Sequence, residues 1–200
     1  MHRILRPLAV AAAIFAAGCL PVTSKNPAGS TVGFKADPVL AGTWIGRGVE
    51  DKDKSPAYLH FIANEDGTMT AILVSDSMQD HRGEWSEYTL HAALLGSTHV
   101  LSVQEVSNNG TPSGNATATP YILMSYRQDR DGTVTLSIMD DKAAAAAVKA
   151  NEIAGSVDPG EDGDVHITAD AKALDKFLAS SRGAALFSKP LLTMKRLEIK

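Results

Sequence analysis

Alternation of apolar and polar residues dominates the chain between positions 40 and 140. Side chains of a strand point alternately to its two faces, so a strand with one buried face shows a period of two. The clearest case is residues 133–140, where Val134, Leu136 and Ile138 fall on one face and threonine or serine on the other. This pattern predicts a β-rich body.

Seven segments of this kind follow one another across turns. Two short turns connect apolar runs, and each has glycine as its last residue: 64–67 (Asn-Glu-Asp-Gly) and 129–132 (Asp-Arg-Asp-Gly). Asp-Gly is a strong hairpin signal because glycine accepts the positive φ that the turn requires. We therefore expect successive antiparallel hairpins formed by strands at 42–49, 58–63, 68–75, 84–93, 99–106, 120–128 and 133–140.

The pattern changes to helical after residue 140. An alanine run, which forms helices readily, follows Asp141. Asp141 can cap it, because its carboxylate accepts a hydrogen bond from a free N–H of the first turn. A second amphipathic segment follows Asp170 and would end at Gly183. We expect helices near 141–151 and 170–181.

The order of these elements indicates the fold class. Short strands are predicted at 153–157, 165–168 and 191–199, whereas the polar stretch 107–119 predicts a long surface loop. Strands first and helices late favour a mainly β, α+β fold. We expect an antiparallel sheet that closes into a small barrel-like or sandwich core, with the helices on one side or end. Residues 38–200 suit one such domain.

The first residues have the features of a secretory signal. Arg3 and Arg6 precede ten uninterrupted apolar residues at 8–17, and small residues follow as far as Cys19. A basic start, a short apolar run and a small-residue cleavage site are typical of such signals. Ten residues are half of the roughly 20 that a membrane-spanning helix needs. We expect residues 1–18 to be a signal peptide.

Residues Ala16-Ala17-Gly18-Cys19 resemble the bacterial lipobox, in which small residues precede a lipidated cysteine, although leucine is commonest where Ala16 stands. The resemblance implies acylation of Cys19, as by palmitate, and cleavage before it; two or more chains anchor a protein stably in a bilayer. Cys19 is the chain's single cysteine, which excludes an internal disulfide. Leu20, where enterobacterial inner-membrane lipoproteins carry aspartate, implies the outer membrane, facing the periplasm. The alternative is an ordinary signal peptide with an incidental cysteine.

The composition of the chain indicates a flexible tether after the signal peptide and a net negative charge on the mature protein. Residues 21–36 are rich in Ser, Thr, Pro, Gly, Asn and Lys, so residues 19–37 are expected to be the lipidated cysteine and a flexible tether. Removal of Arg3 and Arg6 leaves 17 basic residues against 23 acidic ones. Nucleic-acid affinity depends on neutralising phosphates, so we expect no nucleic-acid partner.

Gly42-Thr43-Trp44 resembles the Gly-x-Trp start of lipocalins and related small β-barrels. In that family the tryptophan packs under an arginine from a late strand, and Arg196 is the candidate here. An arginine over an indole contributes about 0.5–2 kcal/mol. The resemblance implies a barrel with Trp44 and Arg196 as ligand-binding candidates, although two other lipocalin signals are absent; the alternative is a plain core tryptophan. The strand-rich body with the tail Gly183–Phe187 (Gly-x-x-Leu-Phe) also resembles a family of uncharacterised bacterial lipoproteins, which implies no activity.

Motifs for catalysis or metal binding are weak. The histidines have no helical i, i+4 spacing. Residues 129–132 resemble part of a calcium loop, but Arg127 and Ile138 occupy its first and twelfth positions and cannot ligate calcium. The acidic stretch 161–164 favours a solvated turn over a weak cation site. The sequence predicts no catalytic residue, metal or cofactor.

Three functions remain open. The sequence favours a non-enzymatic lipoprotein of the cell envelope, bound to the bilayer through acylated Cys19, that acts as an interaction or binding module for an envelope protein. A lipocalin-like carrier of a small apolar ligand is the first alternative. An envelope hydrolase is the second. Glycoside cleavage needs two carboxylates at a set distance, and the sequence does not give the distances between strand carboxylates such as Glu84, Glu87 and Glu105. The carrier's interior would be lined by Trp44, Phe61, Leu73, Leu101, Leu123 and Leu136.

Overall fold

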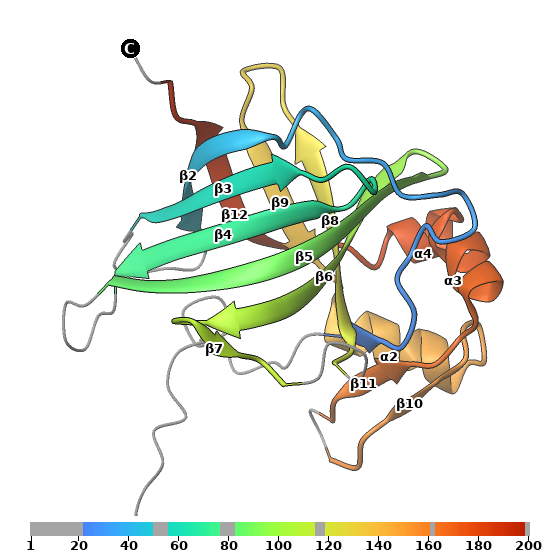
Figure 1. Ribbon diagram of the computed structural model, residues 1–200. Coiled ribbons are helices and arrows are strands. Elements are labelled where there is room, and N and C mark those ends of the chain that lie inside the picture. Colours follow the sequence, from blue (N-terminus) through green and yellow to red (C-terminus); the bar gives the residue numbers. More distant parts are fainter. Residues whose placement is uncertain (1–21, 50–55, 77–82, 115–118, 161–162, 199–200) are drawn as a thin grey trace, which may run out of the picture.

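An eight-stranded antiparallel β-barrel forms the centre of the molecule (Figure 1). The computed structural model describes residues 22–49, 56–76, 83–114, 119–160 and 163–198. The predicted fold class is confirmed, and the sheet closes as a barrel. Around the barrel the order is β2 (Gly42–Gly48), β3 (Ala57–Ala63), β4 (Met69–Asp76), β5 (Gly83–Leu95), β6 (Thr98–Asn108), β8 (Tyr121–Gln128), β9 (Val134–Ile138) and β12 (Lys189–Arg196).

The predicted hairpins are present, and three further pairings close the barrel. Strand β12 lies between β9 and β2, and β6 pairs with β8 as well as with β5. Closure leaves no free sheet edge in the barrel itself, which removes a template for aggregation. Gly67 and Gly132 have φ angles of 84° and 82° in the two Asp-Gly turns, as the sequence predicts.

The polar stretch 107–119 is not wholly a loop. Ser107 and Asn108 extend β6, and β7 (Thr111–Pro112) folds back to pair with them. The prediction is wrong here because both β7 residues are exposed, so the strand has no apolar alternation. Residues 115–118 of this stretch lie outside the described residues.

Two apolar clusters lie on opposite sides of the barrel wall. The inner cluster contains five of the six residues predicted to line the interior. Leu123 is the exception, since it packs outside the barrel with the helices. On β8 the alternate residues Met124 and Tyr126 take the inward positions, so Leu123 must face the other way. The five that face inward are Trp44, Phe61, Leu73, Leu101 and Leu136.

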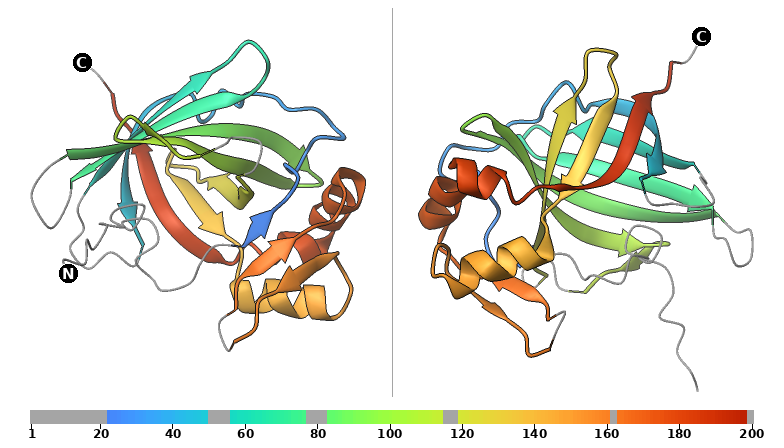
Figure 2. Two further views of the ribbon diagram at one scale, coloured as in Figure 1. Left: turned by 60° about the horizontal axis from the view of Figure 1, so that its bottom comes forward. Right: turned by 180° about the vertical axis from the view of Figure 1, so that it is seen from behind.

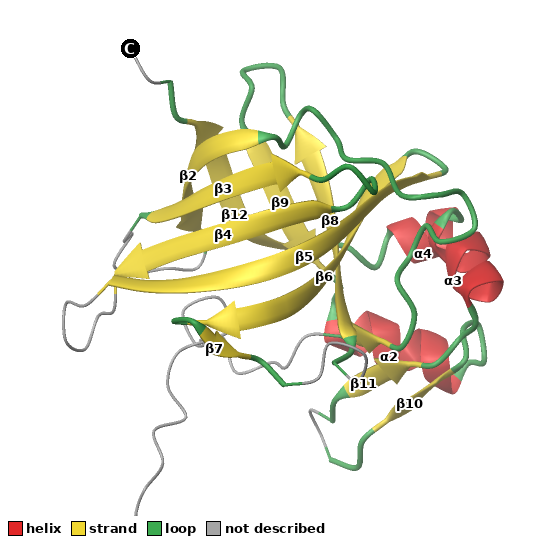
Figure 3. Cartoon of the chain, viewed as in Figure 1, coloured by secondary structure: helices red, strands yellow, loops and turns green. Residues whose placement is uncertain are grey.

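A layer of short helices and a hairpin covers one side of the barrel (Figures 2 and 3). It buries the outer cluster, which includes Val100, Leu174 and Leu178. Asp170 caps its helix as predicted, accepting from the Ala173 N–H at 2.8 Å, whereas the first helix begins one residue early and is capped by Asp140. The layer consists of α2 (Asp141–Lys149), β10 (Gly155–Val157), β11 (Val165–Ile167), α3 (Ala171–Leu178) and α4 (Ser181–Ala184).

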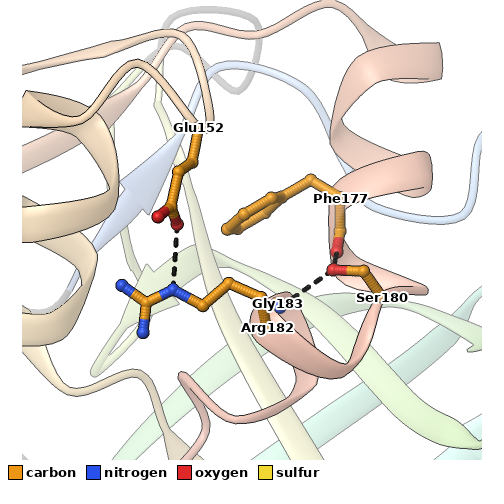
Figure 4. A network of polar contacts seen from close by, with 5 residues as sticks. All are labelled: Glu152, Phe177, Ser180, Arg182 and Gly183. Atoms are coloured by element: carbon orange, nitrogen blue, oxygen red, sulfur yellow. Dashed lines mark hydrogen bonds and ion pairs between the residues drawn. The ribbon is translucent and has the colours of Figure 1, made fainter.

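The sequence predicted that Gly183 ends the second helix. That helix, α3, ends at Leu178, and Gly183 lies buried inside the next helix, α4. The Gly183 N–H donates to Ser180 Oγ at 3.1 Å, and Ser180 Oγ donates to the Phe177 carbonyl at 2.6 Å (Figure 4). Arg182 alongside pairs with Glu152 at 2.9 Å. A Cβ on Gly183 would lie 2.2 Å from the Phe177 carbonyl oxygen. Close backbone approach, and not helix termination, therefore requires this glycine.

Residues 22–37, called the strap below, were predicted to be part of a flexible tether, and that prediction is wrong. Strand β1 (Thr23–Ser24) pairs with β8 and β11. Val22 and Ala28 are 3% and 0% exposed. The strap then passes α3 and crosses to β2 along the barrel (Figure 1). Residues 19–21 lie outside the described part of the chain.

Candidate ligand-binding cavity

Trp44 and Arg196, the two ligand-binding candidates, meet as the lipocalin resemblance implies. Their residues are register partners on β2 and β12. The Arg196 guanidinium carbon lies 4.5 Å from the centroid of the Trp44 ring. Cys19, the predicted lipidation site, lies outside the described residues.

This pair closes one end of the barrel. The Trp44 Nε1–H donates to the Leu40 carbonyl at 2.6 Å, and Arg196 donates to the carbonyls of Val39 and Ala41 at 2.8 and 2.5 Å. Trp44 is wholly buried. The two side chains therefore fix residues 39–41 across the barrel end, and neither lines the cavity described next.

That cavity, of about 370 Å³, lies between the strap and the β5–β6 hairpin. Strand β5 is longer than its neighbour β4, and their pairing ends at Leu90 with Met69. Beyond that point β5 extends past the closed part of the barrel, and the strap covers this overhang, with the Lys35 N–H donating to the Ala92 carbonyl at 3.1 Å. The cavity walls are Val32, Gly33, Lys35, Ala36, Asp37 and Pro38 of the strap and Ala92, Ala93, Leu94, His99 and Tyr126 of the barrel.

Three polar side chains meet on one wall. The Tyr126 hydroxyl donates to Asp37 Oδ2 at 2.5 Å, and the Val39 N–H donates to Asp37 Oδ1 at 2.8 Å. His99 Nδ1 lies 3.5 Å from Asp37 Oδ2. Burial, together with the bond to Asp37 and its charge, raises the pKa of Tyr126, so the phenol stays protonated as a donor.

This wall has the chemistry of a binding surface. Both oxygens of Asp37 already accept hydrogen bonds, and Tyr126 holds its proton, so neither is an activated nucleophile. Lys35 is exposed at the rim and has no carboxylate partner within the described ranges. The rest of the walls is largely apolar, and with the Lys35 ammonium at the rim it suits a small molecule with an apolar body and a negatively charged group that lies toward the rim, away from Asp37.

Asp175 on α3 holds the strap that roofs the cavity. Its carboxylate accepts from the N–H groups of Gly29 and Thr31 at 2.6 and 2.9 Å and from the Thr31 hydroxyl at 2.5 Å. The side chain is 5% exposed. Ser102 on β6 adds a bond, accepting from the Ala28 N–H at 2.8 Å. These bonds determine where residues 32–38 lie.

His91 lies under the strap on the outer face of β5. Its ring is 4.4 Å from that of Phe34 and 5.5 Å from that of Tyr121, centroid to centroid. Burial lowers the pKa of His91, and the charge of Asp66 opposes part of that effect. The Nδ1 atom is buried without a hydrogen-bond partner. Protonation of His91 would therefore work against the packing of the strap.

The three strand carboxylates considered for hydrolysis do not all share one face. Glu84 and Glu87 are three residues apart on β5 and point to opposite sides of the barrel wall. Glu105 is the register partner of Tyr88. Burial raises the pKa of Tyr88, a hydrogen bond with Ser86 opposes this, and the charge of Glu105 adds to it.

Sequence reasoning did not select Asp37, His99 and Tyr126 as a group. Asp37 and Tyr126 are 89 positions apart, and no motif spacing connects them. The available signal is the position of Asp37 shortly before the Gly-x-Trp strand, which places it at the barrel end.

Comparisons with known proteins found no match: no family model, no curated protein and no solved structure is significantly similar to this chain. None of the helices in the described ranges has the length and apolar character needed to cross a bilayer.

Proposed function

We propose that this chain is a lipoprotein of the bacterial cell envelope, anchored through acylated Cys19 to the outer membrane and facing the periplasm. The lipobox resemblance of residues 16–19 supports the anchor. Its barrel acts as a binding module and not as an enzyme. A Cys19→Ser variant should lose acylation and signal cleavage, which mass spectrometry of the amino-terminal peptide measures. An unmodified thiol in the wild-type protein would contradict the anchor.

The cavity under the strap is the observation that supports binding of a small molecule. Its volume of about 370 Å³ is within the range of roughly 300–1,000 Å³ typical of small-molecule sites. The apolar part of the walls and the Lys35 ammonium, which has no carboxylate partner among the described residues, favour an amphipathic anion, such as a short acyl chain with a carboxylate. The ligand of this proposal therefore differs from the purely apolar one implied by the lipocalin resemblance.

A matched pair of probes tests this proposal. Binding of decanoate and of the uncharged alcohol decanol to the purified chain is measured by calorimetry. Lys35→Ala should weaken decanoate several-fold and leave decanol unchanged, because only the carboxylate meets the ammonium. Lys25→Ala, an exposed strap lysine outside the cavity, is the control. Ala36→Phe should fill the space and weaken both probes. Equal binding by all variants, or by none, would contradict the site.

A second candidate, docking of an envelope protein, is favoured by an exposed apolar row on the outer barrel face. Tyr58, Val74 and Trp85 are register partners across β3, β4 and β5. Each is exposed, at 44%, 41% and 40%. Contiguous exposed apolar surface is typical of interaction sites. Cross-linking in intact cells from a photoreactive residue at position 74 should capture a partner; the same residue at exposed Asp131 should not.

A further inference from the structure

Three potential metal ligands gather on one face of the β10–β11 hairpin. Asp158 and Asp164 are opposite one another, with the Asp158 N–H donating to the Asp164 carbonyl at 2.9 Å. His166 is two residues beyond Asp164, so it shares that residue's face. One donor atom from each of the three side chains lies within 4.8 Å of the other two.

The hairpin itself holds the two carboxylates together. A Cβ on Gly163 would lie 1.9 Å from the Asp158 carbonyl oxygen. Only glycine permits that approach of the two arms. Strand pairing of Val157 with Val165 and of Ser156 with His166 continues the ladder. The backbone, and not chance rotamers, therefore places Asp158 beside Asp164.

Thr23 orients the imidazole from outside the group. Its Oγ1 lies 2.8 Å from His166 Nδ1 and donates to the Val165 carbonyl at 3.4 Å. The Thr23 oxygen can accept from Nδ1–H while its own hydrogen points to that carbonyl. In that tautomer the neutral ring carries its lone pair on Nε2, which lies 3.7 Å from Asp158 Oδ2. An outer hydrogen bond that fixes the tautomer in this way is a usual companion of a ligating histidine.

We propose that Asp158, Asp164 and His166 bind a divalent transition-metal ion, with Zn²⁺ the best match. An imidazole nitrogen with two carboxylates is a set that Zn²⁺ accepts at about 2.0–2.2 Å. Donors around one such ion are roughly 3–3.5 Å apart, close to the His–Asp distance present. Imidazole disfavours Mg²⁺ and Ca²⁺, which take oxygen ligands. Asp158 is exposed and His166 is half-buried, so water can complete the coordination.

This site shares no residue with the cavity, and it therefore stands apart from the proposed function. Thr23 belongs to β1 and is the register partner of His166 on β11. Metal binding at His166 would consequently fix the start of the strap to the hairpin as well as the two hairpin arms to each other. Thr23 is a positioning residue in this arrangement.

The test uses the full chain without an affinity tag, purified in detergent and stripped with a chelator. Zn²⁺ binding is measured by calorimetry, and Co²⁺ binding by its visible absorption. His166→Gln and Asp164→Asn should each weaken Zn²⁺ at least tenfold. Thr23→Val should weaken it by about tenfold with unchanged stoichiometry, because an outer hydrogen bond affects affinity by roughly 10–100-fold.

His60→Gln is the matched control. His60 Nδ1 has the same 2.8 Å contact with a threonine hydroxyl, that of Thr43, but no group of three potential ligands includes it in the described part of the chain. Its affinity should equal that of the wild type. As a measurement independent of variants, Co²⁺ should broaden the NMR signals of residues 156–158 and 164–166 first. No binding, or equal affinity in wild type and His166→Gln, would overturn the proposal.

Discussion

Replacement of Asp175 by alanine should detach the strap from the helical layer. The buried carboxylate is the acceptor for two backbone N–H groups and one hydroxyl from Gly29 and Thr31. Alanine supplies no acceptor, and the Gly29 N–H is buried next to the fully buried Ala28. The variant must either leave those groups unsatisfied or release the strap.

The magnitude follows from the number and kind of lost bonds. A buried donor left without a partner costs about 1–3 kcal/mol, and the Gly29 N–H is the most buried of the three donors. Removal of the carboxylate also removes the cost of burying its charge, which offsets part of the loss. We expect a decrease of about 3 kcal/mol in the free energy of unfolding. Thr31→Val removes one hydroxyl bond and should cost about 1 kcal/mol.

Urea denaturation at pH 7, followed by tryptophan fluorescence, measures these changes. Lys176→Ala is the control, since Lys176 is exposed on the same helix and should change stability by less than about 0.5 kcal/mol. Amide hydrogen exchange should speed up at Gly29 and Thr31 in Asp175→Ala before it does so in β3 or β4. A loss below about 1 kcal/mol, with protection at Gly29 unchanged, would refute the view that this carboxylate holds the strap.

Three further predictions concern single residues. Arg196→Ala should lower the free energy of unfolding by about 2 kcal/mol in urea titrations, because it removes an indole contact and two bonds to carbonyls; a neutral effect would contradict the closing role. Gly183→Ala should lower the melting temperature, since its Cβ would clash with a backbone oxygen; calorimetry that finds no change would show that the turn can relax. Because the pKa of His91 is lower in the folded chain, the unfolded chain takes up this proton at a higher pH. The free energy of unfolding therefore keeps the full contribution of neutral His91 above about pH 6.5 and decreases as the pH falls below that value. Urea midpoints from pH 7.5 to 5 should show a smaller fall in His91→Phe than in wild type, and parallel curves would refute this.

Local patterns were enough to predict the strands of the β-rich fold and the helices, because each depends on neighbours in sequence. Alternation located the strands, and Asp170 marked the start of α3. The errors concern contacts between distant residues. The strap has the composition of a tether, but Asp175, which orders it, lies 146 positions from Gly29. Leu123 is as apolar as the residues that face inward, and its outward position depends on the helices that cover that side.

The cavity depended on the same long-range contacts. Trp44 and Arg196 could be matched to a known pattern of paired residues, which made their contact predictable. The grouping of Asp37, His99 and Tyr126 required the position of the strap, and the strap was interpreted as a tether. A wrong prediction for sixteen residues, 22–37, therefore hid the cavity as well.

The ordered strap also changes how a lipid anchor would hold the barrel. A tether over residues 19–37 could extend about 60 Å at roughly 3.3–3.6 Å per residue. Val22 already packs in the outer cluster, and three steps separate it from Cys19, a reach of about 10 Å. The proposed lipoprotein should therefore keep the β1–β11 side of its body against the bilayer.

Two fluorescent labels on cysteine variants of the acylated protein in vesicles test this orientation. Exposed Ser156 on β10 is two strands from β1, and exposed Asp131 lies in the turn at the far end of β8. Position 131 is roughly 25 Å farther along, at about 3.3 Å per residue. Lipids with a nitroxide headgroup should quench the label at position 156 strongly and that at position 131 weakly. If the strap holds, Asp175→Ala should release it and make the quenching at the two positions equal. Equal quenching already in the unsubstituted protein would mean that the strap detaches at the membrane, and Asp175→Ala should then leave both signals unchanged.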